Sequence, residues 1–210
     1  MIVTVSRQIG SAGSEIASRV ADALGFRVVD NELIDRVAER AGLPPAEVAN
    51  REERAPGFVE RLVRALSRSA PELQSDPPDR LPEPEEKSLV QITEKVVAEI
   101  AAEGRVVLVG RAAPAVLSGS HDALHVKLVA PLPFRIARIA ERDGVDAREA
   151  ERRVKECDAN RARYHAHHYG RDWNDATNYH MVLNTGMLGL DGATAVIVER
   201  ARAMWEGSRQ

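Results

Sequence analysis

Short apolar runs alternate along this chain with segments whose apolar residues recur at helical spacing. The runs are rich in β-branched residues and span residues 2–5, 26–30, 105–110, 123–130 and 179–185. Strands buried on both faces read as continuous apolar runs, and helical crossovers between them are typical of a parallel sheet. The sequence therefore predicts an α/β fold, with a five-stranded parallel sheet flanked by helices.

Length and charge narrow the class of protein. A chain of 210 residues suffices for one sizeable domain, so we expect a single domain over residues 1–210. The net charge of −3 gives no excess of positive charge for nucleic acid or an anionic membrane, and neither is expected as a partner. No apolar stretch is long enough to span a bilayer, and no signal-peptide pattern is present. Cys157 is the only cysteine, which excludes an internal disulfide and predicts a cytoplasmic protein.

Two segments differ in composition from the rest. Residues 43–87 include "PELQSDPPDRLPEPEEK", which holds five prolines and almost no apolar residues. We therefore interpret 43–87 as a flexible insert on the substrate side, with residues 71–87 poorly ordered without ligand. Residues 131–170 carry two helical patterns crowded with arginine, which we interpret as a helical lid region.

The stretch "RQIGSAGS" joins the first strand to the first helix. In the phosphate-binding pattern GxxxxGK[ST], glycines let backbone N–H groups face the phosphates, and the lysine reaches the terminal phosphates. Here Arg7 stands at the first glycine, Gly13 at the lysine and Ser14 at the hydroxyl position. The small residues still permit a nest of N–H donors at a helix N-terminus. The nest comprises Gly10, Ser11, Ala12, Gly13 and Ser14. On this stretch alone, a tight turn without a ligand is an equal alternative.

Other stretches, in order along nearly the whole chain, resemble the cytidylate kinase-like family. "FRVVDNELIDRVA" is similar to a substrate-binding stretch, and "VVLVGRAAPAVL" to the strand end that reads "DGRD". "APLPFRIARIAERDG" resembles the start of the lid, "KECDANRARY" the segment "DxxDxxR", and "MVLNTGMLGLDGATAVI" the ending. The phosphate loop is similar to a divergent branch reading "SRQxGSGG". The resemblance implies a P-loop NTPase kinase fold, Mg²⁺ with ATP as cofactor, and phosphoryl transfer from a nucleoside triphosphate to a nucleoside monophosphate such as CMP.

The resemblance also implies site residues. Residues expected to bind the acceptor are Asp30, Asn31, Arg36, Arg111, Asp158 and Arg161. Arg135 and Arg138 are expected to neutralise charge in the transition state. The resemblance does not supply a magnesium ligand, because the family's strand-end aspartate is missing here; Glu15 and Asp30 are our candidates to take its place. His165 and His168 stand one helical turn apart, but without a third ligand we expect no protein-built metal site there.

Two departures from the family pattern concern the triphosphate. Gly13 removes the loop lysine, and Val109 stands at the aspartate of "DGRD". Arg7 is the first candidate to replace the lysine and Arg111 the second, because a guanidinium stays charged and grips two phosphate oxygens at once. Two alternatives stay open: a non-catalytic nucleotide-sensing or partner-binding domain on the same fold, and a kinase for a different small phosphorylated acceptor. The oligomeric state is not predicted.

Overall fold

The computed structural model describes residues 1–30, 40, 42 and 86–206. The predicted flexible insert therefore lies outside the described residues, except that Glu86 and Lys87 begin a helix. Asn31 and Arg36 also lie outside them. No helix in the described part of the chain combines the length and the apolar character needed to cross a membrane.

Five parallel strands form one sheet in the order β2-β3-β1-β4-β5, which confirms the predicted α/β architecture. The strands are β1 (Ile2–Arg7), β2 (Arg27–Val29), β3 (Val106–Val109), β4 (Ala123–Val129) and β5 (Met181–Asn184). The chain runs from central β1 to β2 on one side, and β4 lies on the other. Ligands in such sheets bind beyond the carboxyl ends of the strands, where the strand order reverses. That point is the loop after β1.

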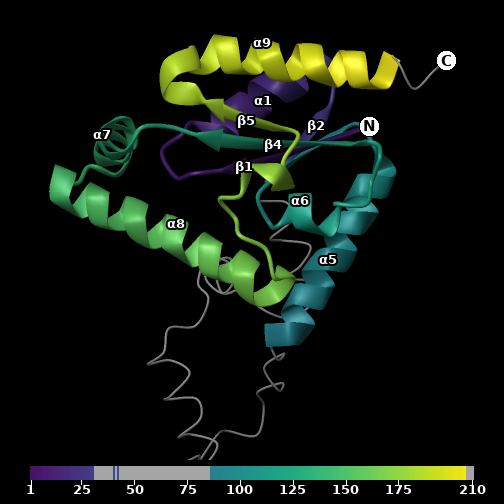
Figure 1. The fold of residues 1–210 in the computed structure, drawn as a ribbon, viewed down its shortest axis with the longest axis horizontal. Helices are drawn as coiled ribbons and strands as arrows, with labels where there is room; N and C mark the ends of the chain where they lie inside the picture. The colour runs from purple at the N-terminus through teal and green to yellow at the C-terminus, as the bar shows by residue number, and fades with distance from the viewer. Residues whose placement is uncertain (31–39, 41, 43–85, 207–210) are drawn as a thin grey trace, which may run out of the picture.

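Helices cover both faces of the sheet. They are α1 (Gly13–Leu24), α5 (Glu86–Glu103), α6 (Ala113–Val116), α7 (Leu132–Asp143), α8 (Ala147–Tyr169) and α9 (Thr185–Glu206), with a 3₁₀ turn at Ala176–Asn178. In Figure 1, α1 and α9 lie above the sheet, while α5, α6 and α8 lie below it. Helices α7 and α8 fall within the segment predicted as a lid, and they pack against each other.

Each face of the sheet has its own apolar core. On one face Ile16 of α1 and Ile197 of α9 pack with Val3 of β1, and all three are fully buried. On the other face Ile100 of α5 packs with Leu108 of β3. Burying one such side chain contributes roughly 1.5–3 kcal/mol. These two cores hold the sheet rigid beneath the loops at its carboxyl edge.

Two helical boundaries differ from the sequence pattern. Helix α9 begins at Thr185, directly after β5, although the apolar periodicity is clear only from residue 192; a kink at Gly189 (φ 67°) joins the two parts. The short helix α6 was not predicted, because Pro114 and the small residues around it carry no helical periodicity. Both helices start at the carboxyl edge of the sheet, so both bear on the site.

Candidate functional site

The loop after β1 is fixed to its surroundings. The buried Ser11 side chain donates from Oγ to the Gln8 carbonyl at 2.8 Å, and its own N–H donates to the same carbonyl at 3.2 Å. Thr185 Oγ1 donates to the Ser11 carbonyl at 2.9 Å. The Ser11 amide is thus engaged within the loop, whereas the amides at the start of α1 precede the first intrahelical bond, from Ile16 N–H to the Ala12 carbonyl. Helix α1 begins directly after this loop, and its N-terminus, which attracts anions, faces the site.

The Arg7 side chain occupies the space that a loop lysine would enter. A Cβ atom built at Gly13 would lie 2.6 Å from both Cβ and Cγ of Arg7, and one built at Gly110 would lie 2.0 Å from an Arg7 guanidinium nitrogen. Real Cβ atoms do not approach other heavy atoms so closely, so both positions require glycine while Arg7 lies there. Compared with the P-loop pattern, glycine and the cationic residue have exchanged positions 7 and 13. In the structure the Arg7 stem packs against Gly13, so the two positions share one space.

A carboxylate and a hydroxyl meet beside Arg7. Asp30, directly after β2, accepts a hydrogen bond on Oδ2 from Ser14 Oγ at 3.1 Å. Its Oδ1 lies 3.5 Å from an Arg7 guanidinium nitrogen. Glu15, the other predicted magnesium ligand, binds Arg19 at 3.0 Å and Arg138 at 3.4 Å. The hydroxyl–carboxylate pair fits a magnesium ion, which takes one or two protein carboxylates and otherwise phosphate and water oxygens.

The turn after β3 is strained in the way functional turns often are. Gly110, Arg111 and Ala112 follow one another with φ of 76°, 53° and 50°. Left-handed backbone costs non-glycine residues roughly 1–2 kcal/mol each. The turn brings the Arg111 side chain to the carboxyl edge of the sheet beside β1, where the sequence placed it.

Arginines on α7 and α8 take two different positions. Arg161 donates to the Arg7 carbonyl at 3.0 Å and lines the space beside the loop. Arg138 lies on the rim with its side chain 40% exposed. Arg135, only 7% exposed, pairs with Asp158 at 2.5 Å beneath the loop. Of the arginines expected at the site, Arg161 and Arg138 border open space and Arg135 is packed inside.

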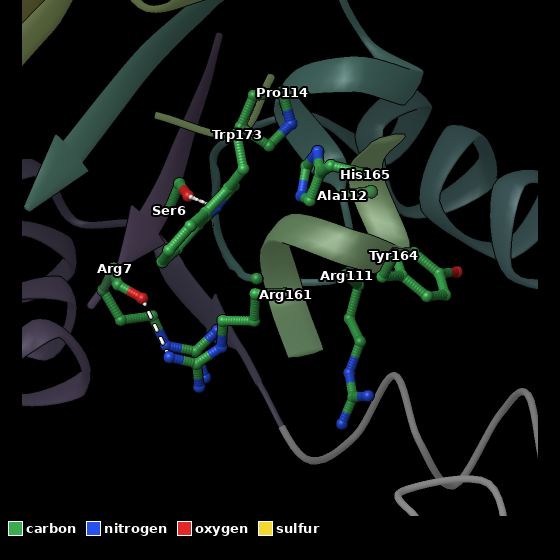
Figure 2. A pocket seen from close by; sticks show the side chains of 10 residues that line it. Ser6, Arg7, Arg111, Ala112, Pro114, Arg161, Tyr164, His165 and Trp173 are labelled. Atoms are coloured by element: carbon green, nitrogen blue, oxygen red, sulfur yellow. Dashed lines mark hydrogen bonds between the residues drawn. The ribbon is translucent and has the colours of Figure 1, made fainter. Parts of the chain in front are cut away.

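Two adjoining cavities share Arg7 and Arg161. The larger, of about 520 Å³, lies between the phosphate loop, α7 and α8, and is also lined by Arg138. The smaller, of about 50 Å³, lies between the strand ends of β1 and β3, α8 and Trp173, and is also lined by Arg111. Figure 2 shows the Arg7 and Arg161 side chains converging, with Arg111 extending from the same cavity. The fold thus gathers four of the predicted arginines, Arg7, Arg111, Arg138 and Arg161, around these two cavities.

One wall of the smaller cavity was not predicted as part of the site. Trp173 donates from Nε1 to Ser6 Oγ at 2.9 Å (Figure 2). Buried Lys127 on β4 donates to the Trp173 carbonyl and, at 3.1 Å, to Asn174 Oδ1, with its Nζ 3.9 Å from the Trp173 ring centroid. Burial lowers the pKa of Lys127 to about 8, while Asp158 and Asp172 act to raise it. The sequence carried one signal for this wall: Lys127 lies inside a largely apolar strand, and a buried charge requires polar partners nearby.

The described residues contain no cluster of three or more histidine, cysteine, aspartate or glutamate side chains able to hold a metal ion. His165 is buried on α8, and burial, followed by the charge of Lys127, lowers its pKa to about 4.

Solved structures resemble this chain along almost its full length. An uncharacterized protein from Eubacterium ventriosum superposes with a TM-score of 0.69 at 20% identity, covering 96% of this chain and 98% of that one. Shikimate kinase from Bacteroides thetaiotaomicron superposes with a TM-score of 0.52 at 14% identity, covering 98% of both chains. The chain therefore has the P-loop kinase fold.

Sequence comparison is more specific. Cytidylate kinase from Natronomonas pharaonis is 26% identical over 204 residues, which are 97% of this chain and 90% of that protein. Cytidylate kinase from Methanopyrus kandleri is 26% identical over 206 residues, 94% of this chain and 91% of that protein. The sequence model of the cytidylate kinase-like family matches residues 2–187. By this match the chain belongs to the cytidylate kinase-like family.

Proposed function

We propose that this protein transfers a phosphoryl group from a nucleoside triphosphate to a nucleoside monophosphate, with CMP as the first acceptor to test, in the cytoplasm. One observation carries the proposal: the Arg7 side chain lies over Gly13, where a P-loop lysine would begin. The Arg7 stem lies over Gly13 and its guanidinium lies beside Gly110 and Asp30, so a cation stands next to the phosphate loop although the lysine is absent. The names of the two archaeal relatives support the acceptor class.

The donor phosphates would lie in the larger cavity. Amides at the start of α1 would bind them, Arg7 would approach from the strand side and Arg138 from α7. Ser14 and Asp30 would hold magnesium. When bound, the ion neutralises charge on the phosphate oxygens.

The phosphate of the acceptor would lie in the smaller cavity, whose volume of about 50 Å³ is too small for a whole nucleotide. Arg111 and Arg161 would bind this phosphate, and Trp173 would form the wall opposite α8. In the transfer, an acceptor phosphate oxygen bonds to the terminal phosphorus of the donor while the bond from that phosphorus to the bridging oxygen breaks. Such chemistry depends mainly on positioning and charge stabilisation. Arg7 and Arg161 border both cavities, so they stand where the transferring group would pass.

The direct test is an assay of purified protein with ATP, Mg²⁺ and one monophosphate at a time, followed by ³¹P NMR. Formation of CDP and ADP supports the proposal. Transfer to another small phosphorylated acceptor would identify a kinase of different specificity. Saturable binding of ATP and CMP without any transfer would favour the non-catalytic nucleotide-sensing alternative, for which the missing lysine and the Val109 position argue.

Removing the Asp30 carboxylate is expected to reduce the magnesium dependence of nucleotide binding. In Asp30→Asn, the ratio of ATP affinity with Mg²⁺ to that without it should fall at least threefold, because the amide lacks the negative charge that the carboxylate offers the ion. Isothermal titration calorimetry measures both affinities. Asp22→Asn, at an exposed position on α1, is the matched control. An unchanged ratio in Asp30→Asn would remove Asp30 from the metal site.

Truncating Arg161 or Arg111 is expected to abolish the rise in melting temperature caused by CMP. A ligand that binds only the folded state raises that temperature, and each side chain would supply a charged contact to the acceptor. The unliganded melting temperatures of Arg161→Ala and Arg111→Ala should stay within a few degrees of the parent. Arg152→Ala, which breaks exposed pairs with Glu149 and Glu156 on α8, should bind CMP normally. A large drop without ligand would assign both arginines to bracing the fold.

A further inference from the structure

The phosphate loop is attached to α7 and α8 by one ion pair. Asp158 on α8 accepts a hydrogen bond on Oδ1 from the Ile9 N–H at 3.1 Å. Its Oδ2 lies 2.5 Å from a guanidinium nitrogen of Arg135 on α7. The side chains are 17% and 9% exposed. The carboxylate therefore joins the loop to both helices from a largely buried position.

Arg135 makes three further contacts, one with Ala130 after β4 and two with the loop itself. Its Nε donates to the Ala130 carbonyl at 3.1 Å, and a terminal nitrogen donates to the Ile9 carbonyl at 3.4 Å. Its backbone packs against Gly10, where a Cβ atom would lie 2.8 Å from the Arg135 carbonyl oxygen. Gly10 has φ of 80°, so glycine is needed there on two counts. Asp158 and Arg135 thus fix the Ile9 N–H, the Ile9 carbonyl and the Gly10 backbone.

These contacts differ from the roles that the family resemblance implies, in which Asp158 binds the acceptor nucleotide and Arg135 neutralises charge in the transition state. Here the Asp158 oxygens receive the loop amide and Arg135, and Arg135 is directed at backbone carbonyls and at Asp158. We propose that Asp158 and Arg135 are positioning residues, which hold Ile9 and Gly10 so that the amides at the start of α1 face the donor phosphates. This role rests on the proposed donor site and deepens it.

The arrangement also links the two halves of the site. Arg161 Nη1 lies 3.7 Å from Asp158 Oδ1 and donates to the Arg7 carbonyl at 3.0 Å. Asp158 thereby bears on the residue before the loop through Arg161 and on the loop itself through Ile9. Preorganised donors are worth more than donors that must reorient when charge develops, because no reorganisation is needed during the reaction.

The test measures binding of two probes separately. Tripolyphosphate presents only the phosphates of the donor, and CMP only the acceptor. In Asp158→Ala, tripolyphosphate affinity should fall at least tenfold. CMP affinity should change less than twofold, because the hydrogen bond from Arg161 to the Arg7 carbonyl at 3.0 Å does not involve Asp158. Calorimetry measures both affinities. Asp158→Asn keeps an oxygen for the Ile9 amide but not the charge, so its loss should be smaller, about threefold; it also serves if Asp158→Ala does not fold. Arg135→Met should resemble Asp158→Ala.

The matched control is Arg153→Met. Arg153 pairs with Asp143 at 3.0 Å and so also joins α8 to α7, but away from the loop. This variant should bind both probes normally. Loss of CMP affinity with unchanged tripolyphosphate affinity in Asp158→Ala would overturn the proposal and return Asp158 to the acceptor site. Unchanged affinity for both probes would overturn it as well.

A second readout does not depend on nucleotide binding. Amide hydrogen exchange of Ile9, followed by NMR in the unliganded protein, should be at least tenfold faster in Asp158→Ala and unchanged in Arg153→Met. Unchanged Ile9 exchange in Asp158→Ala overturns the positioning role. If the parent protein binds neither probe, the proposed function fails, while this exchange measurement still decides whether Asp158 fixes the loop.

Discussion

Replacing Arg7 by methionine is expected to weaken triphosphate binding, or lower its kcat/KM, at least tenfold, which corresponds to about 1.4 kcal/mol or more. The methionine stem can still cover Gly13, so the folded state should lose little stability. What is lost is the positive charge that Arg7 places beside Gly110 and Asp30, next to the phosphate loop. Calorimetry with ATP and steady-state kinetics measure the two quantities. Unchanged affinity and rate would exclude Arg7 from the site.

The reciprocal exchange gives a sharper control. Gly13→Lys alone should bind ATP worse than the parent, because its Cβ would lie 2.6 Å from Arg7. Adding Arg7→Gly removes that clash and restores a lysine in its usual place. The double variant should therefore bind ATP at least tenfold more tightly than Gly13→Lys, a coupling expected only of residues that share one space. Additive effects would mean that the two positions act independently.

The fold could be predicted from the sequence because its strands carry a strong local signal. The short, largely apolar runs in β1, β3 and β4 are typical of strands buried on both faces, and the structure has them at the centre of the sheet. The strand order could not be derived from those runs. It depends on which faces of α1 and α9 pack on the sheet, which is a property of the assembled core.

The site could be predicted only in part, for a related reason. Residues at strand ends, such as Arg7 and Arg111, could be predicted as site residues because parallel strands bring their carboxyl ends to one edge of the sheet. The contact between Asp158 and the Ile9 amide joins residues 149 positions apart, and no local pattern encodes it. Sequence resemblance assigned Asp158 to the acceptor, whereas its contacts lie with the loop.

Lys127 and Trp173 show a third case. Trp173 is buried, with 2% of its surface exposed. Trp173 nevertheless lines the smaller cavity, and the Lys127 ammonium group on β4 packs against its ring. A residue can thus be a packing residue and a wall of a site at once, and periodicity alone cannot separate the two.

Acid is expected to destabilise this protein over a pH range set by two buried histidines. Burial, and next the neighbouring His180, lowers the pKa of His125 to about 4, although the Leu117 backbone acts to raise it. The pKa of His165 is also lowered to about 4, mainly by burial and next by Lys127. Arg171 lowers both pKa values further. In the unfolded chain, histidine titrates near its ordinary pKa of about 6.5.

The sign follows from the direction of these differences. Because the folded pKa values lie below the unfolded one, the unfolded chain binds more protons between pH 6.5 and 4, and stability falls as the pH drops through that range. Above pH 6.5 both rings are neutral in either state and add no slope. Each histidine should cost about 2–3 kcal/mol by pH 4.5. Together they approach the whole free energy of unfolding of a typical domain, about 5–15 kcal/mol.

Urea unfolding at pH 7.0, 6.0, 5.0 and 4.5 measures this loss. In the parent the free energy of unfolding should fall by about 4–6 kcal/mol over the series. His125→Asn should be less stable at pH 7, because Asn fills less space beside Thr4, but its fall with pH should be about half as large. His167→Gln, at an exposed position on α8, should follow the parent. Parallel curves for the parent and His125→Asn would show that His125 is not a source of the acid sensitivity, because the same loss of stability would then occur in a chain that lacks this histidine.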